Sequence, residues 1–263
     1  GDRVMPGIYG LIVFSKCIND DVHAEYTAML AAMKGAMMYE KYYESKQYIN
    51  THLGVYIGWV GEERTEGLQH ICESPESGRI LFSAGAFDFD SGALGDYKEI
   101  LKNDVKMGEQ WPRKIGGLNA GCLIDERNNS VFLFNDRYGM ERIFLYEDAE
   151  KIIFSSEAKA ILAVMKAVRK FDPKGIAQYL TCGCTLEESS LYSNIRIMPG
   201  GSIMQFSKGK SPIFKKYFDV SEWESSKPMA EVTFIEQYST ALIETIENYE
   251  KTGSRKDLSL TGG

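Results

Sequence analysis

The sequence has few histidines, no long apolar run and no excess of basic residues. Its 263 residues include 3 His, and 30 Lys or Arg stand against 37 Asp or Glu, which leaves a net charge of -7. An acidic surface repels phosphate backbones, so we expect no nucleic-acid partner. No apolar run approaches the roughly 20 residues that span a bilayer, so we expect no membrane partner.

Cysteine is scarce as well. The five Cys are odd in number and mostly lie in apolar stretches, which favours a reducing, cytoplasmic location over a disulfide framework. The start GDRVMPG lacks the basic flank, apolar core and cleavage site of a signal peptide. Cys182 and Cys184 would be half of a zinc site, but no second pair completes the four ligands. We therefore expect no metal.

Short apolar segments punctuated by turn residues are abundant. They predict strands over 7–14, 52–60, 79–87, 118–125, 130–136, 142–147 and 151–156. Helical spacing of apolar residues predicts helices over 22–43, 96–107, 157–167, 172–180 and 231–249. The pattern therefore predicts one β-rich domain with helices on its faces, followed by a polar linker and a further helix.

The middle of the chain resembles a known family. The run LFNDRYGMERIFLYEDAEKIIFSSEAKAIL (133–162) resembles the D-R-F-G-x-K-P-L-Y-Y … F-A-S-E-x-K-A-L-L signature of asparagine synthetases. The run FDPKGIAQYLTCGCTLEESSLYSNIRIMPGGSIMQF (171–206) follows their L-D-P … T-L-F … L-P-P-G pattern in the same order. KKYFDV (215–220) stands where they have R-Y-W-D. The resemblance covers nearly the whole chain.

The resemblance implies two units. Residues 5–220 would form a class II glutamine amidotransferase domain, an α+β fold of the N-terminal-nucleophile hydrolase type: a four-layer αββα sandwich with two stacked sheets between helices. Residues 221–230 would be a linker. Residues 231–263 would be the truncated start of an ATP-pyrophosphatase synthetase domain.

The ending SLTGG is similar to the first part of the family's S-G-G-x-D-S pyrophosphate loop. Thr261, Gly262 and Gly263 would be the remnant of this loop, whose backbone N–H groups can cradle a phosphate. The resemblance implies ATP and Mg only for the rest of the synthetase domain, and no cofactor on this chain. The synthetase domain is the expected partner. The sequence leaves open whether the protein also forms a homodimer.

The amino-terminal stretch MPGIYG differs from the family at the position that matters most. Class II amidotransferases begin M-C-G-I-x-G, and after removal of Met the Cys supplies both the thiol nucleophile and the α-amine that acts as its base. Here Pro6 occupies that position, and proline has no nucleophilic side chain. Cys17 lies too far along the chain to replace it.

Other site positions have changed too. The family's N-G-E-x-Y-N element supplies an Asn donor to the oxyanion hole, and the corresponding AGAFDF (84–89) reads Ala84, Gly85, Ala86. Gly85 can still place a backbone N–H against a substrate, but the lost Asn donor costs on the order of 10²–10³ in rate.

Two groups that would hold the substrate remain to be assigned. The Arg that pairs with the substrate carboxylate has no counterpart in 52–60, where Tyr56 or Trp59 stands near the place, and neither can make a bidentate bond to a carboxylate. Asp96 in Gly95-Asp96 is the weak candidate for the Asp that holds the substrate amine.

We therefore predict a domain without catalytic residues. It would have a structural or regulatory role for a synthetase domain that uses ammonia or a substrate amine, similar to β-lactam synthetase, carbapenam synthetase and lasso-peptide cyclases. Two alternatives stay open: a module that binds a partner or a small amide without chemistry, and an active glutaminase with a relocated nucleophile. Ammonia release from glutamine separates the last from the others.

Overall fold

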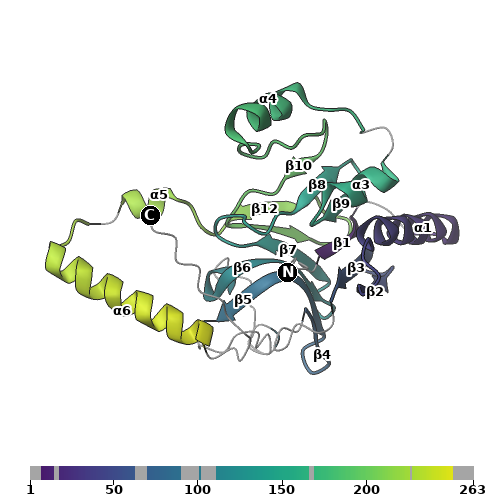
Figure 1. Cartoon of the computed structure of the whole chain (residues 1–263). Helices are drawn as coiled ribbons and strands as arrows, with labels where there is room; N and C mark the ends of the chain where they lie inside the picture. Colours follow the sequence, from purple (N-terminus) through teal and green to yellow (C-terminus); the bar gives the residue numbers. More distant parts are fainter. Residues whose placement is uncertain are drawn as a thin grey trace.

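Two six-stranded antiparallel sheets face each other in this computed structural model (Figure 1). The structure describes residues 7–14, 18–62, 70–89, 101, 111–165, 169–225 and 227–250, without the side chains of 86–89 and 248–250. The first sheet contains β1 (Gly7–Val13), β2 (Glu44–Asn50), β3 (Val55–Gly61), β8 (Phe144–Glu147), β9 (Lys151–Ser155) and β10 (Arg196–Ile197). The second contains β4 (Ile71–Ser74), β5 (Arg79–Phe89), β6 (Ile115–Asp125), β7 (Ser130–Asn135), β11 (Ser202–Phe206) and β12 (Ile213–Lys216).

The strands do not follow sequence order across either sheet. The first sheet runs β10-β8-β9-β1-β3-β2 and the second runs β12-β11-β7-β6-β5-β4. The first strand, β1, is therefore central, paired with β3 on one side and with β9 on the other. All seven predicted strands are confirmed, whereas β2, β4, β10, β11 and β12 were not predicted.

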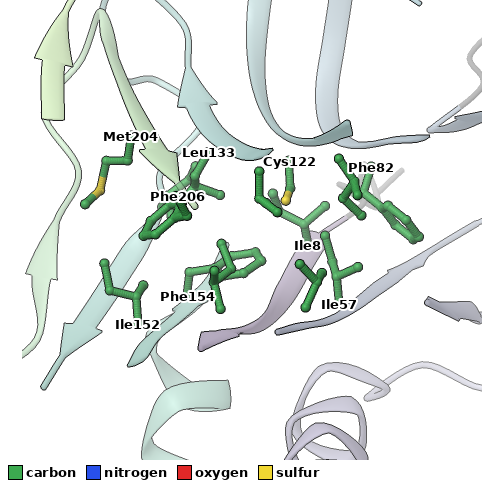
Figure 2. Close-up of a cluster of buried hydrophobic side chains, with 14 of the residues drawn as sticks. Ile8, Ile57, Phe82, Cys122, Leu133, Ile152, Phe154, Met204 and Phe206 are labelled. Atoms are coloured by element: carbon green, nitrogen blue, oxygen red, sulfur yellow. The ribbon is translucent and has the colours of Figure 1, made fainter. Parts of the chain in front are cut away.

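The main core lies between the sheets (Figure 2). Ile8, Ile57, Ile152 and Phe154 point from the first sheet toward Phe82, Cys122, Leu133, Met204 and Phe206 of the second. Each of the larger apolar side chains contributes roughly 1.5–3 kcal/mol when it is fully buried. This packing is the driving force that holds the two sheets together.

Helices cover the outer face of the first sheet. α1 (Asp20–Met37) and α3 (Ala158–Val164) contact each other, and their apolar residues pack on the face of β1, β3 and β9 that points away from the second sheet. On the outer face of the second sheet, Leu101 and the short helix η1 (Trp111–Lys114) pack against β5, β6 and β7. The layers are those of the predicted α+β sandwich. The predicted helix 96–107 lies outside the described residues, except for Leu101.

The remaining helices differ from the predictions mainly at their ends. α1 ends at Met37 and not at residue 43, because the chain turns there and Tyr39 and Tyr42 pack edge-on against Tyr43. α4 (Pro173–Cys182) is capped by Asp172, which accepts hydrogen bonds from two backbone N–H groups of the first turn, as Asp-Pro predicts.

The carboxyl-terminal elements are α5 (Ser221–Glu224) and α6 (Glu231–Glu250). α5 is a single turn inside the predicted linker, and α6 closely matches the helix predicted over 231–249. The apolar residues of α6 are about half exposed: Val232, Phe234, Ile235, Tyr238, Leu242, Ile243 and Ile246. The domain boundaries at 220 and 230 stay a prediction. None of the described helices is both long and apolar enough to cross a membrane.

The start of α1 offers a first test of the fold. Asn19 accepts a hydrogen bond from the Val22 N–H at 2.9 Å, which satisfies one of the free donors of the helix. Asn19→Ala is expected to lower the free energy of unfolding by about 1 kcal/mol, measured by urea denaturation. Asn19→Asp should keep the cap, and an equal loss in both variants would contradict this role.

Candidate functional site

The position expected for the nucleophile directly precedes the amino-terminal end of β1. The Ile8 N–H donates to Ser156 Oγ at 3.0 Å, and Ile8 pairs with Trp59 of β3. A Cβ on Gly7 would lie 2.5 Å from Met37 Cε, so the strand packs tightly against α1. Pro6 itself lies outside the described residues. The frame of the expected site is therefore present directly after the substituted position.

β5 carries the counterpart of the oxyanion element. Ala84 is fully buried in the same core cluster as Ile8 and Trp59. Gly85 has a φ of +87°, and a Cβ there would lie 2.2 Å from the carbonyl oxygen of Leu118, so only glycine fits. Ala86 pairs with Leu118, and its side chain is not described. The special backbone conformation at Gly85 is retained, while the neighbouring side chain offers no hydrogen-bond donor.

Of the two residues proposed near the lost Arg, only Trp59 lies on the interior face. Tyr56 points to α1, where its hydroxyl lies 3.0 Å from His23 Nδ1 and its ring packs edge-on against Tyr26. Trp59 belongs to the cluster between the sheets. The substrate carboxylate therefore has no cationic partner at either position.

Trp59 stacks on a histidine. The rings of Trp59 and His70 lie 5.5 Å apart at 21°. His70 precedes β4, and its carbonyl oxygen accepts from the Ser83 N–H at 2.8 Å and the Ser83 hydroxyl at 3.1 Å. Both rings are almost fully buried. Among the described residues Trp59 Nε1 has no hydrogen-bond partner, whereas the His70 ring interacts with the backbone of Ser83. Burial lowers the pKa of His70 to about 4, so its ring is neutral at pH 7.

Glu141 lies beside Gly85. A Cβ on Gly85 would be 2.6 Å from Glu141 Cγ, which places this carboxyl group against β5. Its side chain is buried, and burial, followed by the nearby negative charge of Asp136, raises the pKa of Glu141 to about 7. Glu141 stands where the family signature D-R-F-G-x-K has Lys. A carboxyl group therefore replaces a cation next to the oxyanion element.

Asp136, the first residue of that signature, holds the loop that positions Glu141. Its carboxylate accepts hydrogen bonds from the backbone N–H groups of Tyr138, Met140 and Glu141, at 2.9, 3.1 and 2.9 Å. Asp136 is almost fully buried. The Asp of the signature thus has an architectural role here.

Other predicted site residues fall outside this region. Asp96, Thr261, Gly262 and Gly263 lie outside the described residues. Cys182 is exposed and Cys184 is half-buried at the end of α4. Within the described ranges, no group of three His, Cys, Asp or Glu residues could hold a metal ion.

The family profile described as "Glutamine amidotransferase domain" matches residues 88–218. The chain contains a glutamine amidotransferase domain. It is 29% identical over 140 residues to a Methanocaldococcus jannaschii protein provisionally named asparagine synthetase (glutamine-hydrolyzing) 2, and 25% identical over 126 residues to asparagine synthetase (glutamine-hydrolyzing) 3 of Bacillus subtilis. These matches cover 52% and 48% of this chain, but only 26% and 20% of the relatives. The chain therefore spans about a quarter of their length.

Two solved structures are similar to this amidotransferase domain. One is the glutamine phosphoribosylpyrophosphate amidotransferase of B. subtilis complexed with ADP and GMP, with a TM-score of 0.48. The other is described as the allosteric regulatory enzyme of purine biosynthesis, with a TM-score of 0.42. Each is 11% identical, and each match covers 80% of this chain and 49% of the other.

The amidotransferase domain contains two site features that the sequence did not predict. His70 had no recognisable motif around it, and its contact joins Trp59 of the first sheet to the residue that precedes β4 of the second. Glu141 was visible in principle, because it departs from the Lys of a signature that the surrounding residues otherwise follow. Both are buried groups next to β5.

Proposed function

We propose that this amidotransferase domain has lost glutaminase chemistry and serves as a structural or regulatory partner of an ATP-dependent synthetase domain. The observation that carries the proposal is Pro6 in the sequence directly ahead of β1, a strand that is buried along its whole length. A proline there supplies neither a thiol nor a hydroxyl, so the step that forms an acyl-enzyme has no nucleophile.

The neighbouring positions support the same conclusion. Ala84 is surrounded by hydrocarbon and cannot donate a hydrogen bond to an oxyanion. Trp59 replaces the guanidinium that would pair with the substrate carboxylate. Because three independent groups have changed, reverting one of them would not restore the reaction.

The described cysteines are poor candidates for a relocated nucleophile. Cys122 is fully buried between the sheets, and this burial strongly raises the pKa of its thiol, which therefore stays protonated (Figure 2). Cys72 is buried on the outer face of the second sheet, whereas Cys182 is the last residue of α4 and Cys184 follows it, away from β1 and β5. A protonated, buried thiol is not a useful nucleophile.

A synthetase partner is supported by the relatives and by α6. Both relatives are named as asparagine synthetases, and the matched part is a minority of each. α6 is amphipathic, but its apolar side is about half exposed, which a further domain would cover. In this proposal the synthetase domain binds ATP and Mg, forms an amide bond with ammonia or a substrate amine, and works in the cytoplasm.

Glutamine turnover tests the loss of chemistry. The purified chain is expected to release no ammonia from L-glutamine above a heat-denatured blank at pH 7.5, because it lacks the nucleophile. Alkylation of the thiols should not change the measured ammonia release. Ammonia release that alkylation abolishes would overturn the proposal, and Cys17→Ser would then test whether that thiol is the relocated nucleophile.

Binding of a small amide without chemistry is the second candidate function. One observation favours it: the buried Trp59 indole N–H, at the β1 end of the sandwich, has no hydrogen-bond partner among the described residues.

A further inference from the structure

Two cysteines flank the turn that ends α4, and the proposed function does not involve them. Cys182 is the last residue of α4 and is exposed, whereas Cys184 is half-buried two residues later. α4 lies at the periphery of the molecule, away from the core between the sheets (Figure 1). Oxidants in solution can therefore reach this pair, in contrast to Cys72 and Cys122, which are buried.

The residue between the two cysteines sets the distance between them. Gly183 has a left-handed backbone conformation, with a φ of +74° and a ψ of 0°. A residue this compact places the Cα atoms on either side of it about 5.5 Å apart, as a helical residue does. That separation lies within the range that disulfides require. In a continued right-handed helix, the two side chains would instead be rotated about 200° from each other.

Hydrogen bonds hold both sides of the turn. The Gly183 N–H donates to the carbonyl oxygen of Tyr179 at 2.9 Å, which closes the end of the helix. On the far side, the Leu186 N–H donates to Gln178 Oε1 at 3.1 Å, so the chain folds back along α4. The two thiols are therefore carried by backbone that is already fixed in a tight turn, which raises the effective concentration of one thiol toward the other.

We propose that Cys182 and Cys184 form a redox-active dithiol that exchanges with low-molecular-weight disulfides such as oxidised glutathione. The thiolate of Cys182, the more exposed residue, attacks one sulfur of the oxidant, breaks its S–S bond and releases one glutathione. The Cys184 thiolate then attacks Cys182 Sγ, forms the intramolecular disulfide and releases the second glutathione. The two protein thiols give up two electrons and two protons, which convert the oxidant into two thiols.

This disulfide is readily reversible, because strained or exposed disulfides are the ones that thiols reduce easily. Oxidation links the end of α4 covalently to the segment that folds back on it. The exposed apolar residues Leu180 and Leu186 lie on these two stretches, so the redox state controls how firmly this surface is ordered. The inference goes beyond the proposed function, because it requires neither the presence nor the loss of glutaminase chemistry.

Thiol labelling of the whole chain tests the inference. The protein is equilibrated with oxidised or reduced glutathione, its free thiols are alkylated, and its peptides are mapped by mass. After oxidised glutathione, the peptide that contains both Cys182 and Cys184 should carry neither the alkyl label nor glutathione, as an internal disulfide requires. After reduced glutathione, both cysteines should be labelled. Cys17→Ser is the control and should give the wild-type result.

Substitution of either cysteine separates the two steps of the exchange. Cys184→Ser removes the thiol that completes the exchange, so this variant should accumulate the mixed disulfide with glutathione at Cys182. Cys182→Ser leaves only the half-buried thiol and should form its mixed disulfide several-fold more slowly.

Substitution of Gly183 tests the role of the turn. Gly183→Ala disfavours the left-handed conformation without a clash, since nothing lies within 4 Å of the added Cβ. It should lower the equilibrium constant for oxidation by glutathione at least about fivefold. Gly183→Asn is the matched control, because Asn adopts left-handed backbone more readily, and it should stay within about twofold of the wild type.

Three results would overturn the inference. Alkylation of both cysteines after oxidised glutathione would show that no disulfide forms. A stable mixed disulfide in the wild type would show that Cys184 does not complete the exchange. Disulfide-linked dimers of the chain would show that the thiols react between molecules and not within one. Ammonia release from glutamine would overturn the proposed loss of glutaminase chemistry but not this inference, so the two can fail separately.

Discussion

Asp136→Ala is expected to lower the free energy of unfolding by about 3–5 kcal/mol, because three backbone N–H groups would lose a charged acceptor at once. Asp136 is almost fully buried, so water cannot easily replace the lost bonds. Urea denaturation at pH 7 measures the change. The loop from Tyr138 to Glu141 should lose its amide-exchange protection before the sheets do.

Asp136→Asn is the matched control. The side-chain amide keeps one acceptor oxygen, so this variant should lose clearly less stability than Asp136→Ala. A loss below about 1 kcal/mol for Asp136→Ala, within the range of an ordinary surface substitution, would contradict the architectural role.

The architectural role of Asp136 explains why the family signature can still be recognised in the sequence although the expected site residues differ. Asp136 and Gly85 are fixed by hydrogen bonds and backbone conformation that the fold itself requires. In the proposed function, Pro6 and Ala84 occupy positions that only the glutaminase reaction constrained. On that proposal, a sequence pattern that serves the fold persists after the pattern that serves the reaction is lost.

The sequence predicted the strands that are buried on both faces, since a continuous apolar run marks them. β1, β3 and β7 are wholly buried and were all found. β2 reads ESKQYIN and β12 reads IFKK, and both are edge strands with exposed or half-exposed side chains. Their pairing depends on a neighbour that is distant in sequence, which no local pattern records.

The candidate site also shows that contacts between residues distant in sequence cannot be predicted from local patterns. The substitutions at Pro6 and Ala84 could be read directly, because a motif defined what should stand there. The contact between Trp59 and His70 could not, because Trp59 lies in β3 of the first sheet and His70 precedes β4 of the second, so their contact follows from how the sheets pack. The sequence also could not predict which of Tyr56 and Trp59 faces the interior, because that depends on how β3 is oriented in the sheet.

Buried groups near β5 should also make stability depend on pH, in two opposite directions. The pKa of Glu141 is raised from 4.5 to about 7, so the folded state keeps this proton longer and stability falls as pH rises from about 4.5 through 7. The pKa of His70 is lowered from 6.5 to about 4, so the unfolded state binds this proton first. Stability from His70 therefore falls as pH drops from about 6.5 through 4.

Glu141→Gln is expected to raise the free energy of unfolding at pH 8 by about 2–3 kcal/mol, because it removes a carboxylate that is buried beside Asp136. The wild-type protein should show nearly constant stability between pH 4.5 and 6.5, where the two groups offset each other. In Glu141→Gln, stability should rise with pH across this window, since only the His70 contribution remains.

Urea denaturation at half-unit pH steps follows both effects, with the exposed Glu76→Gln as the control that should keep the wild-type profile. His70→Phe should give the reverse slope, with stability that falls as pH rises. A Glu141→Gln protein that is no more stable than wild type at pH 8 would show that this carboxyl group is not desolvated. Opposite slopes in the two variants would instead identify Glu141 and His70 as neutral groups, each held so by burial beside β5.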